Sequence, residues 1–293
     1  MMERSTIKGK VTEFPAKVTL SQELFTRLSM FIYNICGIKM PPSKKTMLEA
    51  RLIKRMRSLG FPSLQEYCGY LFSKEGETKE IENMIDAITT NKTDFFREAQ
   101  HFEFLVAQAI PNLINSSGAG IRRTLMVWSA ACSSGEETYT LAMVLEEFSK
   151  TRSGFDYMIL GTDISTKMLG MAQKAIYDEE RVIPVPFYLR QRYFLRSKDR
   201  DKREVRVIPE LRAKVRFRWL NFMEEDFGFR EKMDVIFCRN VLIYFDRPTQ
   251  ERVVRHLCKH LESGGYLFTG HSETLNGMNL PLQAVANTVS RRI

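Results

Sequence analysis

Apolar residues recur at intervals of three and four positions from about residue 20 to residue 87, the spacing that gathers them on one face of an α-helix. The pattern is interrupted at Gly37, at the prolines 41–42 and at the Gly-Phe-Pro run 60–62, which are residues that end helices. Several short helices are therefore expected instead of one long helix. The pattern predicts a small all-α N-terminal domain over residues 19–90.

Beyond about residue 120, short apolar runs rich in β-forming residues alternate with amphipathic helical segments. The expected strands cover residues 123–131, 157–163, 233–239 and 265–270, and the expected helices cover residues 136–148, 165–176 and 248–261. This alternation predicts an α/β fold with a doubly wound, mostly parallel sheet. We assign this domain to residues 91–293 and treat residues 1–18 as an N-terminal extension that could be disordered.

One segment of the second domain has a different pattern. Residues 214–219 (KVRFRW) alternate strictly between cationic and apolar side chains, which indicates a strand with one buried face and one basic face. We predict a small antiparallel β excursion over about residues 190–219, running from Tyr193 to Trp219, with the charged run 198–204 as its turn.

Composition is typical of a globular cytoplasmic protein, with 44% hydrophobic and 27% charged residues. The sequence shows no apolar run of signal-peptide type and no stretch near the roughly 20 apolar residues that a membrane span needs, so neither secretion nor membrane insertion is expected. The five cysteines lack paired CxxC spacing and are interpreted as reduced thiols. His256 and His260 share a helix face, but no further ligand cluster accompanies them, so no metal is predicted.

The net charge of +9 is concentrated in two segments. Residues 39–57 hold seven Lys or Arg against the single acid Glu49, and residues 190–218 hold twelve against four acids. Localised positive charge of this kind indicates an acidic partner.

In an open parallel sheet, ligands bind at the carboxyl ends of the strands, so the residues there are candidates for a binding site. The first strand leads into small residues and then Glu136, the second ends at Asp163, and the third ends at Arg239-Asn240. A single glycine, Gly135, stands where a dinucleotide fingerprint would have three, which argues against a bound pyrophosphate. Acids at a helix start suit a ligand with a cationic centre, such as S-adenosylmethionine, although they also stabilise the helix by themselves.

Four segments of the sequence resemble the hallmark segments of the CheR chemotaxis receptor methyltransferases. They are residues 89–98 (TTNKTDFFRE), 127–137 (VWSAACSSGEE), 237–246 (FCRNVLIYFD) and 270–273 (GHSE). The resemblance covers nearly the whole chain from about residue 20, and the segments occur in order at compatible spacing. For the first segment there is also a purely structural interpretation, in which Thr93 or Asp94 is the N-cap of a helix that carries the following phenylalanines.

The resemblance implies a Rossmann-like class I methyltransferase that uses S-adenosyl-L-methionine and releases S-adenosyl-L-homocysteine. The residues that would contact the cofactor or line its pocket are Asn91, Thr93, Arg97, Glu136, Asp163, Asn221, Phe222, Arg239 and Asn240. Among them, Glu136 would hold the methionine ammonium and Asp163 the ribose hydroxyls, while Asn221 and Phe222 would flank the adenine. Arg97 would grip the substrate carboxylate, and Tyr244, near the methyl group, would align it by a hydrogen bond.

The implied substrate is the cytoplasmic helical domain of chemotaxis receptors, whose glutamate side chains would become methyl esters in sensory adaptation. A cationic helix is a suitable docking surface for such acidic helices, and its candidate residues are Arg51, Lys54, Arg55 and Arg57. The alternative is an ordinary solvated helix face. Some family members also grip a receptor tail peptide through a glycine-containing loop of the excursion, but the matching residues 197–204 (SKDRDKRE) hold no glycine.

Two other functions compete with this interpretation. The first is a methyltransferase that acts on nucleic acid, since basic residues can follow phosphates, but the excursion lacks exposed aromatic residues between its cations that would stack on bases. The second is a binding module that responds to S-adenosylmethionine without turnover, which would not need Arg97 and Tyr244. We therefore expect a protein-glutamate O-methyltransferase with no nucleic-acid partner.

Overall fold

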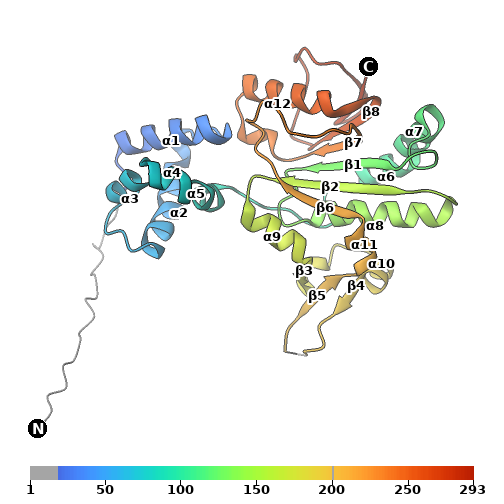
Figure 1. The fold of residues 1–293 in the computed structure, drawn as a ribbon, viewed down its shortest axis with the longest axis horizontal. Helices are drawn as coiled ribbons and strands as arrows, with labels where there is room; N and C mark the ends of the chain where they lie inside the picture. The colour runs from blue at the N-terminus through green and yellow to red at the C-terminus, as the bar shows by residue number, and fades with distance from the viewer. Residues whose placement is uncertain (1–18, 200) are drawn as a thin grey trace, which may run out of the picture. The chain divides into compact units, whose positions relative to one another are not determined.

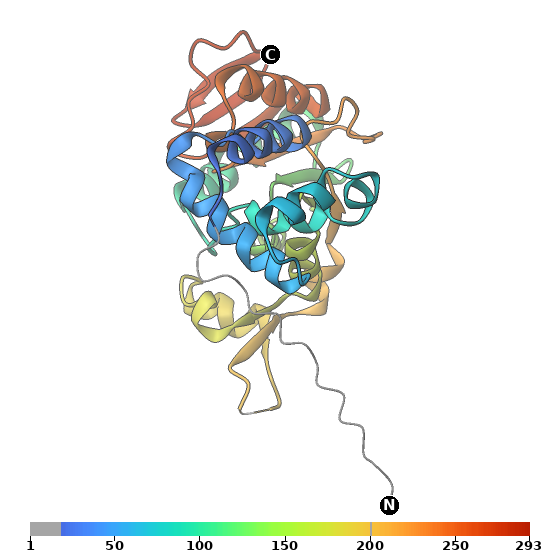
Figure 2. The same cartoon turned by 90° about the vertical axis from the view of Figure 1, so that its left-hand side faces the viewer.

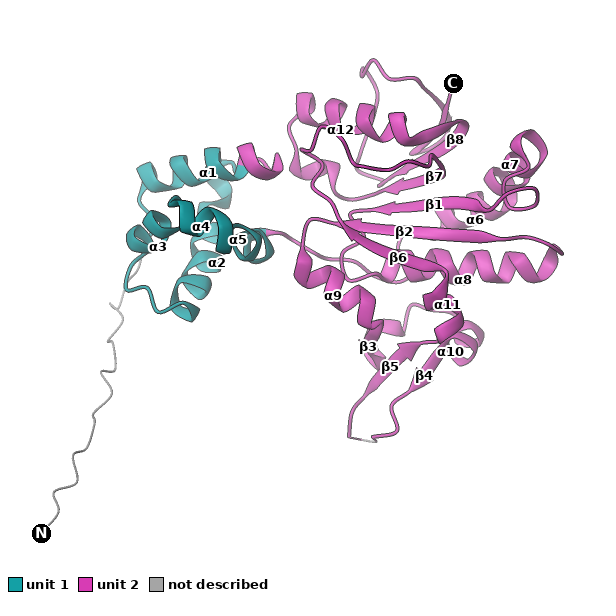
Figure 3. Cartoon of the chain, viewed as in Figure 1, with its two compact units in different colours: residues 1–32, 40–88 teal, residues 33–39, 89–293 magenta. Residues whose placement is uncertain are grey.

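The structure is a computed structural model that describes residues 19–199 and 201–293 (Figure 1, and turned by 90° in Figure 2). The expected extension at residues 1–18 lies outside the described residues. The chain divides into two compact units (Figure 3). The helical unit comprises the described residues up to Ile32 together with Met40–Ile88. The sheet unit comprises Tyr33–Lys39 together with Thr89–Ile293.

The helical unit consists of short helices, as its sequence pattern predicts. They are α1 (Gln22–Cys36, whose last turn belongs to the sheet unit), η1 (Pro42–Lys44), α2 (Lys45–Ser58), α3 (Leu64–Leu71), α4 (Lys74–Lys79) and α5 (Ile81–Ile88). Leu48, Leu52 and Met56 recur at intervals of four along α2 and are all fully buried. Helix α3 begins after Ser63, whose hydroxyl accepts the Glu66 amide at 3.2 Å and so satisfies a free N–H of the first turn.

The sheet unit is built on seven strands in the order β6-β2-β1-β7-β8-β10-β9. They are β1 (Leu125–Ala130), β2 (Tyr157–Asp163), β6 (Val215–Trp219), β7 (Met233–Cys238), β8 (Leu261–Thr269), β9 (Leu282–Ala286) and β10 (Val289–Arg292). The first five strands of this order are parallel, and β10 pairs in antiparallel fashion with β8 on one side and β9 on the other. The predicted doubly wound, mostly parallel sheet is confirmed.

Helices cover both faces of this sheet. They are α6 (Gln100–Phe104), η2 (Leu105–Ala109), α7 (Ile110–Ser117), α8 (Glu136–Thr151), α9 (Thr166–Lys174), α11 (Pro209–Ala213), η4 (Leu242–Tyr244) and α12 (Arg247–His260). Helices α8 and α12 lie on opposite faces (Figure 1). None of the helices among the described residues combines the length and the apolar character needed to cross a bilayer.

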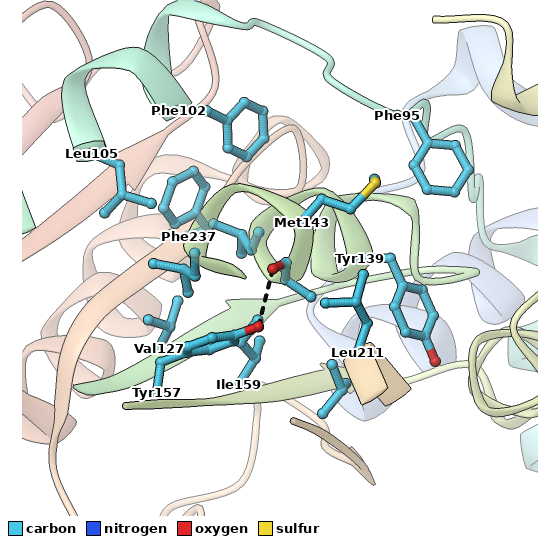
Figure 4. Close-up of a cluster of buried hydrophobic side chains, with 14 of the residues drawn as sticks. Phe95, Phe102, Leu105, Val127, Tyr139, Met143, Tyr157, Ile159, Leu211 and Phe237 are labelled. Atoms are coloured by element: carbon cyan, nitrogen blue, oxygen red, sulfur yellow. Dashed lines mark hydrogen bonds between the residues drawn. The ribbon is translucent and has the colours of Figure 1, made fainter. Parts of the chain in front are cut away.

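The central strands are buried on both faces, which explains why they appear in the sequence as continuous apolar runs. Along β7, Val235 and Phe237 join the core beneath α8, while the alternate residues Ile236 and Cys238 join the core beneath α12. Figure 4 shows part of the first core, where the hydroxyl of Tyr157 donates to the Ala142 carbonyl at 3.1 Å. Two packed cores hold the strand ends in place, and the binding site depends on that rigidity.

The structure corrects one assignment made from the sequence. The small antiparallel sheet is formed by β3 (Ile176–Asp178), β5 (Glu204–Val207) and β4 (Phe194–Arg196), with η3 (Glu179–Val182) and α10 (Phe187–Tyr193) between β3 and β4. Residues 215–219 do not belong to it, because β6 pairs in parallel with β2 at the edge of the large sheet. An alternating pattern predicts a half-exposed strand but does not identify its partner, so the excursion was placed too late in the chain.

Candidate functional site

Four neighbouring strands of the sheet unit end at one edge, because β6, β2, β1 and β7 are adjacent and parallel. Each is followed by residues that the sequence predicts to bind the cofactor. They are Asn221 and Phe222 after β6, Asp163 at the end of β2, Glu136 after β1, and Arg239 and Asn240 after β7. The structure thus gathers six of the nine predicted cofactor residues along one edge.

The turn between β1 and α8 is made of small residues in an unusual backbone conformation. Ala131, Ser133 and Gly135 have φ values of 64°, 49° and 94°, so three residues of one short turn lie in the left-handed region. For Ala131 and Ser133 this conformation costs free energy, and such strain is common where a loop is shaped to receive a ligand. The turn is tightly packed, because Ser133 and Ser134 are buried and a Cβ at Gly135 would lie only 2.9 Å from that of Ala172.

Asp163 is held rigidly at the end of β2. Its Oδ2 accepts the Ser133 amide at 2.8 Å and its Oδ1 accepts the Ser165 amide at 2.9 Å, while the side chain is only 7% exposed. A buried carboxylate that is fixed by backbone amides is a well-oriented acceptor, and each of its oxygens can accept more than one hydrogen bond. Such a group suits the hydroxyls of a ribose.

Glu136, the first residue of α8, is completely buried. Its Oε2 accepts the Ser134 hydroxyl at 2.7 Å, whereas its buried Oε1 accepts no hydrogen bond from the described residues. That oxygen faces the guanidinium of Arg181 in η3. Burial raises the pKa of Glu136 above its ordinary value, although the Ser134 bond and Arg181 act in the opposite direction. That oxygen is already paired with a cation of the protein, so a bound ammonium would share Glu136 with Arg181.

S-adenosylmethionine fits this donor set. Its ammonium matches the buried carboxylate of Glu136, and its ribose diol matches the fixed carboxylate of Asp163. Both acids are held by successive residues of one turn, Ser133 and Ser134, so the turn fixes their mutual position. The two acids are therefore bonded to consecutive residues of one loop, and their joint role in holding the cofactor stays a prediction.

The segment of residues 91–98 lies across the ends of β1 and β7. Ser133 donates through its hydroxyl to the Asn91 carbonyl at 2.9 Å, and the Phe96 amide donates to Thr140 of α8 at 3.1 Å. At its far end, Arg239 donates to the Arg97 carbonyl at 2.5 Å. This places the predicted residues Asn91, Thr93 and Arg97 beside the strand ends.

The capping interpretation of this segment is wrong. Helix α6 begins at Gln100 after Ala99, so neither Thr93 nor Asp94 is its N-cap. Residues 91–98 are instead irregular, with Phe96 and Glu98 at φ values of 54° and 57°. The half-buried Arg97 donates from Nη1 to the Lys92 carbonyl at 3.2 Å, which bends its side chain back along the segment.

Arg239 and Asn240 have well-defined internal partners. The buried guanidinium of Arg239 lies 3.0 Å from Glu98 Oε2 and 3.2 Å from Glu137 Oε2. Asn240 donates from its side chain to the other oxygen of Glu98 at 3.2 Å. Arg239 thus fastens the 91–98 segment to α8 and β7, and its predicted contact with the cofactor stays a prediction.

Glu273 organises the turn after β7. Its Oε2 accepts the amides of Asn240 at 2.8 Å and Gly270 at 2.6 Å, and its Oε1 accepts the amides of Leu242 at 2.7 Å and Ile243 at 3.4 Å. Four backbone donors therefore converge on one buried carboxylate. The sequence singled out the GHSE run without giving this glutamate a role, because three of its four partners lie 30 to 33 positions away.

Asn221, Phe222 and Tyr244 lie at the remaining end of the site. Asn221 donates to the Ile35 carbonyl at 2.7 Å and accepts the Met223 amide at 3.0 Å, so its amide is oriented by the sheet unit itself. Phe222 is mostly buried, and its ring centroid lies 6.4 Å from that of Phe245. Tyr244 ends η4 and is half-buried, and its place near the methyl group stays a prediction.

One group of side chains in the sheet unit has the composition of a metal site. Glu98, His101 and His271 place one ligand atom each within 4.8 Å of one another. However, Glu98 already faces the cation of Arg239, and burial together with that cation lowers the pKa of His101 to about 4. The positive charge is thus supplied by the protein, and the absence of a metal stays a prediction.

A separate cavity of about 780 Å³ lies on the excursion. Its lining mixes acids, arginines and apolar residues of η3, α10, β4 and β5, including Glu180, Ile183, Phe187 and Arg196. None of the predicted cofactor residues lines it. It is therefore a hollow of the excursion that lies apart from the strand ends.

The predicted docking residues of α2 fall into two groups. Arg55 forms a two-pronged pair with the buried Glu80, at 2.7 and 2.6 Å, and Arg51 donates to the Ile88 carbonyl. Lys54 and Arg57 are exposed. Arg51 and Arg55 thus hold parts of the helical unit together, and Lys54 and Arg57 lie on its surface.

Comparisons with known proteins give matches over most of the chain. The family model described as the CheR methyltransferase all-alpha domain matches residues 23–89, and that described as the CheR methyltransferase SAM binding domain matches residues 91–290. The chain is 41% identical over 270 residues to the chemotaxis protein methyltransferase of Borreliella burgdorferi, covering 90% of this chain and 93% of that protein. It is 37% identical to the Escherichia coli protein of the same name, covering 89% and 87% respectively.

Proposed function

Because the chain belongs to the CheR methyltransferase family, we propose that it transfers the methyl group of S-adenosylmethionine to glutamate side chains of chemotaxis receptors. Membership of this family means that the chain is an S-adenosylmethionine-binding methyltransferase of chemotaxis. The proposal concerns the acceptor, which we take to be a glutamate side chain. One observation carries the site: Glu136 and Asp163, on adjacent strand ends, are held by consecutive residues of one turn.

The cofactor supplies a methyl group on a positively charged sulfur. The protein's part is to bind the cofactor at two points. The Glu136 carboxylate would bind the ammonium, and the Asp163 carboxylate would accept hydrogen bonds from the ribose hydroxyls. Asn221 and Phe222, which follow β6, are suitably placed to flank the adenine. These contacts fix the direction in which the methyl group points.

A glutamate acceptor needs no strong general base, because its side chain, with an ordinary pKa of about 4.3, is already ionised near neutral pH. Catalysis then consists mainly of holding one carboxylate oxygen in line with the methyl group. Arg97 is our candidate to hold that carboxylate, since its backbone is fixed by Arg239 and its side chain is half-buried. The contact must stay moderate, because attack neutralises both charges and a tight ion pair would favour the ground state.

Tyr244 is the second catalytic candidate, with its hydroxyl aligning the acceptor carboxylate. The turn that carries it is fixed by the amides of Asn240, Leu242 and Ile243 on Glu273. This rigid support favours a positioning task for η4, in which an error of about 1 Å would reduce the rate strongly.

The acidic helices of receptor cytoplasmic domains suit the cationic surface of α2, where Lys54 and Arg57 are exposed. Such a substrate would place the enzyme in the cytoplasm. Electrostatic docking of this kind mainly raises the rate of encounter and weakens with salt.

The deciding experiment incubates the protein with methyl-labelled S-adenosylmethionine and receptor-containing membranes. We expect label on the receptor that is released by mild base, as a methyl ester requires, and that is lost when the receptor glutamates are replaced by alanine. Base-stable label, or label in added RNA or DNA, would reject the glutamate acceptor. Cofactor binding without any transfer would indicate a binding module instead.

A further inference from the structure

Arg181 occupies a position that the cofactor must share. It lies in η3 of the excursion, and its Nη2 faces Glu136 Oε1 and lies 3.4 Å from the Ser134 hydroxyl. The neighbouring residues Glu179, Glu180 and Val182 line the excursion cavity, whereas Arg181 is directed toward α8. A cation therefore stands next to the acid that would receive the cofactor's ammonium.

The chemistry of an amino acid explains how both cations can remain. In the methionine part of the cofactor, the ammonium and the carboxylate are attached to one carbon atom. If the ammonium sits on Glu136, the carboxylate must lie close by and needs a donor of its own, because a partly buried carboxylate without a partner is costly. The guanidinium paired with the same glutamate is a suitable donor.

Arg181 also has the capacity for this contact. A guanidinium carries five N–H donors, and both contacts of Arg181 with the described residues use Nη2. Its side chain is 35% exposed, so one side of the group is open to a ligand. Glu136 and Arg181 together present a negative and a positive group side by side, which is the complement of a zwitterion.

We propose that Arg181 binds the α-carboxylate of the cofactor's methionine part, so that Glu136 and Arg181 form one receptor for the amino-acid zwitterion. The inference rests on the cofactor and on Glu136 as the ammonium site, and it does not depend on a glutamate acceptor. It gives the excursion, through η3, a part in cofactor binding.

The test measures binding calorimetrically in the absence of any acceptor, with two ligands. S-adenosylhomocysteine has the α-carboxylate, and its decarboxylated analogue lacks only that group. We expect the intact protein to prefer S-adenosylhomocysteine, and Arg181→Met to weaken its binding by about 10- to 100-fold, the size of one charge-assisted hydrogen bond. Binding of the decarboxylated analogue should change by less than threefold, so that the preference disappears.

Two further variants complete the comparison. Arg181→Lys keeps the charge without the planar fork and should lose affinity only in part. Arg196→Met removes an 83% exposed cation of the same excursion and should leave both affinities unchanged. If Arg181→Met does not fold, Arg181→Gln serves for the same measurement.

Three results would overturn the proposal. Equal weakening of both ligands would mean that Arg181 acts only by supporting Glu136. Tighter binding of S-adenosylhomocysteine would mean that Arg181 competes with the ammonium, and no change in either ligand would mean that it takes no part. Because no methyl group is transferred in this experiment, its failure would leave the proposed glutamate acceptor untouched.

Discussion

The backbone amide of Ser133 donates to the Asp163 carboxylate at 2.8 Å, and so joins the turn after β1 to the end of β2. The same turn bonds Glu136 through the next residue, Ser134. The position of each acid therefore depends on the conformation of a loop whose residues Ala131, Ser133 and Gly135 all have positive φ. A change at either acid is expected to disturb the loop as well as the contact with the cofactor.

Asp163→Asn should weaken S-adenosylhomocysteine binding at least tenfold. The substitution removes the charge and turns one oxygen into an NH₂ group, which would face a backbone donor, either Ser133 or Ser165. Calorimetric titration gives the affinity, and thermal unfolding should show a decrease in Tm of several degrees. Asp199→Asn, in the exposed charged run, is the matched control and should change neither value. An unchanged affinity in Asp163→Asn would exclude this carboxylate from the ribose site.

Cofactor affinity should fall as the pH decreases through the pKa of Glu136. Burial raises this pKa in the free protein, and a bound ammonium would lower it again because it stabilises the charged form. Affinity is therefore complete above the free-state pKa and decreases below it, by at most tenfold per pH unit. The charged and polar groups that act on Glu136 are Arg181, Ser134 and Asp94.

The pH profile is measured by titrating S-adenosylhomocysteine at a series of pH values. Glu136→Gln should bind weakly at every pH and show a flat profile over the same range. Methylthioadenosine, which lacks the amino-acid part, should give a flat profile with the intact protein. A slope that persists in Glu136→Gln would assign the titration to another group.

Glu273→Gln should lower both stability and cofactor affinity. The new NH₂ group would face two backbone donors, either those of Asn240 and Gly270 or those of Leu242 and Ile243. A buried donor that loses its acceptor costs about 1–3 kcal/mol, so Tm should drop by several degrees. Glu262→Gln, at a partly exposed position of β8, is a suitable control. An unchanged Tm would show that the carboxylate does not hold this turn.

Tyr244→Phe should separate catalysis from binding. If the hydroxyl aligns the acceptor, its loss should reduce kcat by about 10-fold or more while the affinity for S-adenosylhomocysteine stays within twofold. Steady-state assays with receptor membranes give kcat, and calorimetry gives the affinity. Tyr188→Phe, an exposed tyrosine of α10, is the control. A loss confined to affinity would place Tyr244 in the cofactor pocket alone.

The parallel sheet could be predicted because its strands are buried on both faces and so appear as apolar runs between amphipathic helices. The pattern was less informative for β6, since strict alternation fits the edge of either sheet. The candidate site was located from the ends of these runs, because ligands bind at the carboxyl ends of parallel strands and Asp163 and Arg239 stand there. Those parts of the prediction depend on local periodicity.

Other residues could not be predicted because their chemistry arises from contacts between distant positions. Arg181 stands in a charged run with no mark of a binding residue, and only the fold directs it toward Glu136. In the same way, the helical angles of α2 place Arg55 beside other cations but do not show that Glu80, 25 positions away, takes up its charge. Only tertiary structure separates a cation used internally from one offered to a partner.

The difference between paired and exposed cations decides which variants can test the docking surface. Arg55→Glu would set a carboxylate against the buried Glu80, and an uncompensated buried charge costs roughly 3–5 kcal/mol, so a loss of activity would only report unfolding of the helical unit. Lys54 and Arg57 are exposed, and the double variant Lys54→Glu/Arg57→Glu should keep its Tm within about two degrees.

With receptor membranes at low salt, this double variant should raise KM several-fold while kcat and the affinity for S-adenosylhomocysteine stay constant. The effect should shrink as ionic strength increases, because exposed charges are screened beyond about 10 Å at 0.1 M salt. The double variant Lys74→Glu/Lys79→Glu makes the same change of charge on α4 and is the matched control. If both double variants raise KM equally, the effect comes from the net charge of the unit. A larger increase for the α2 variant alone would locate the docking surface on that helix.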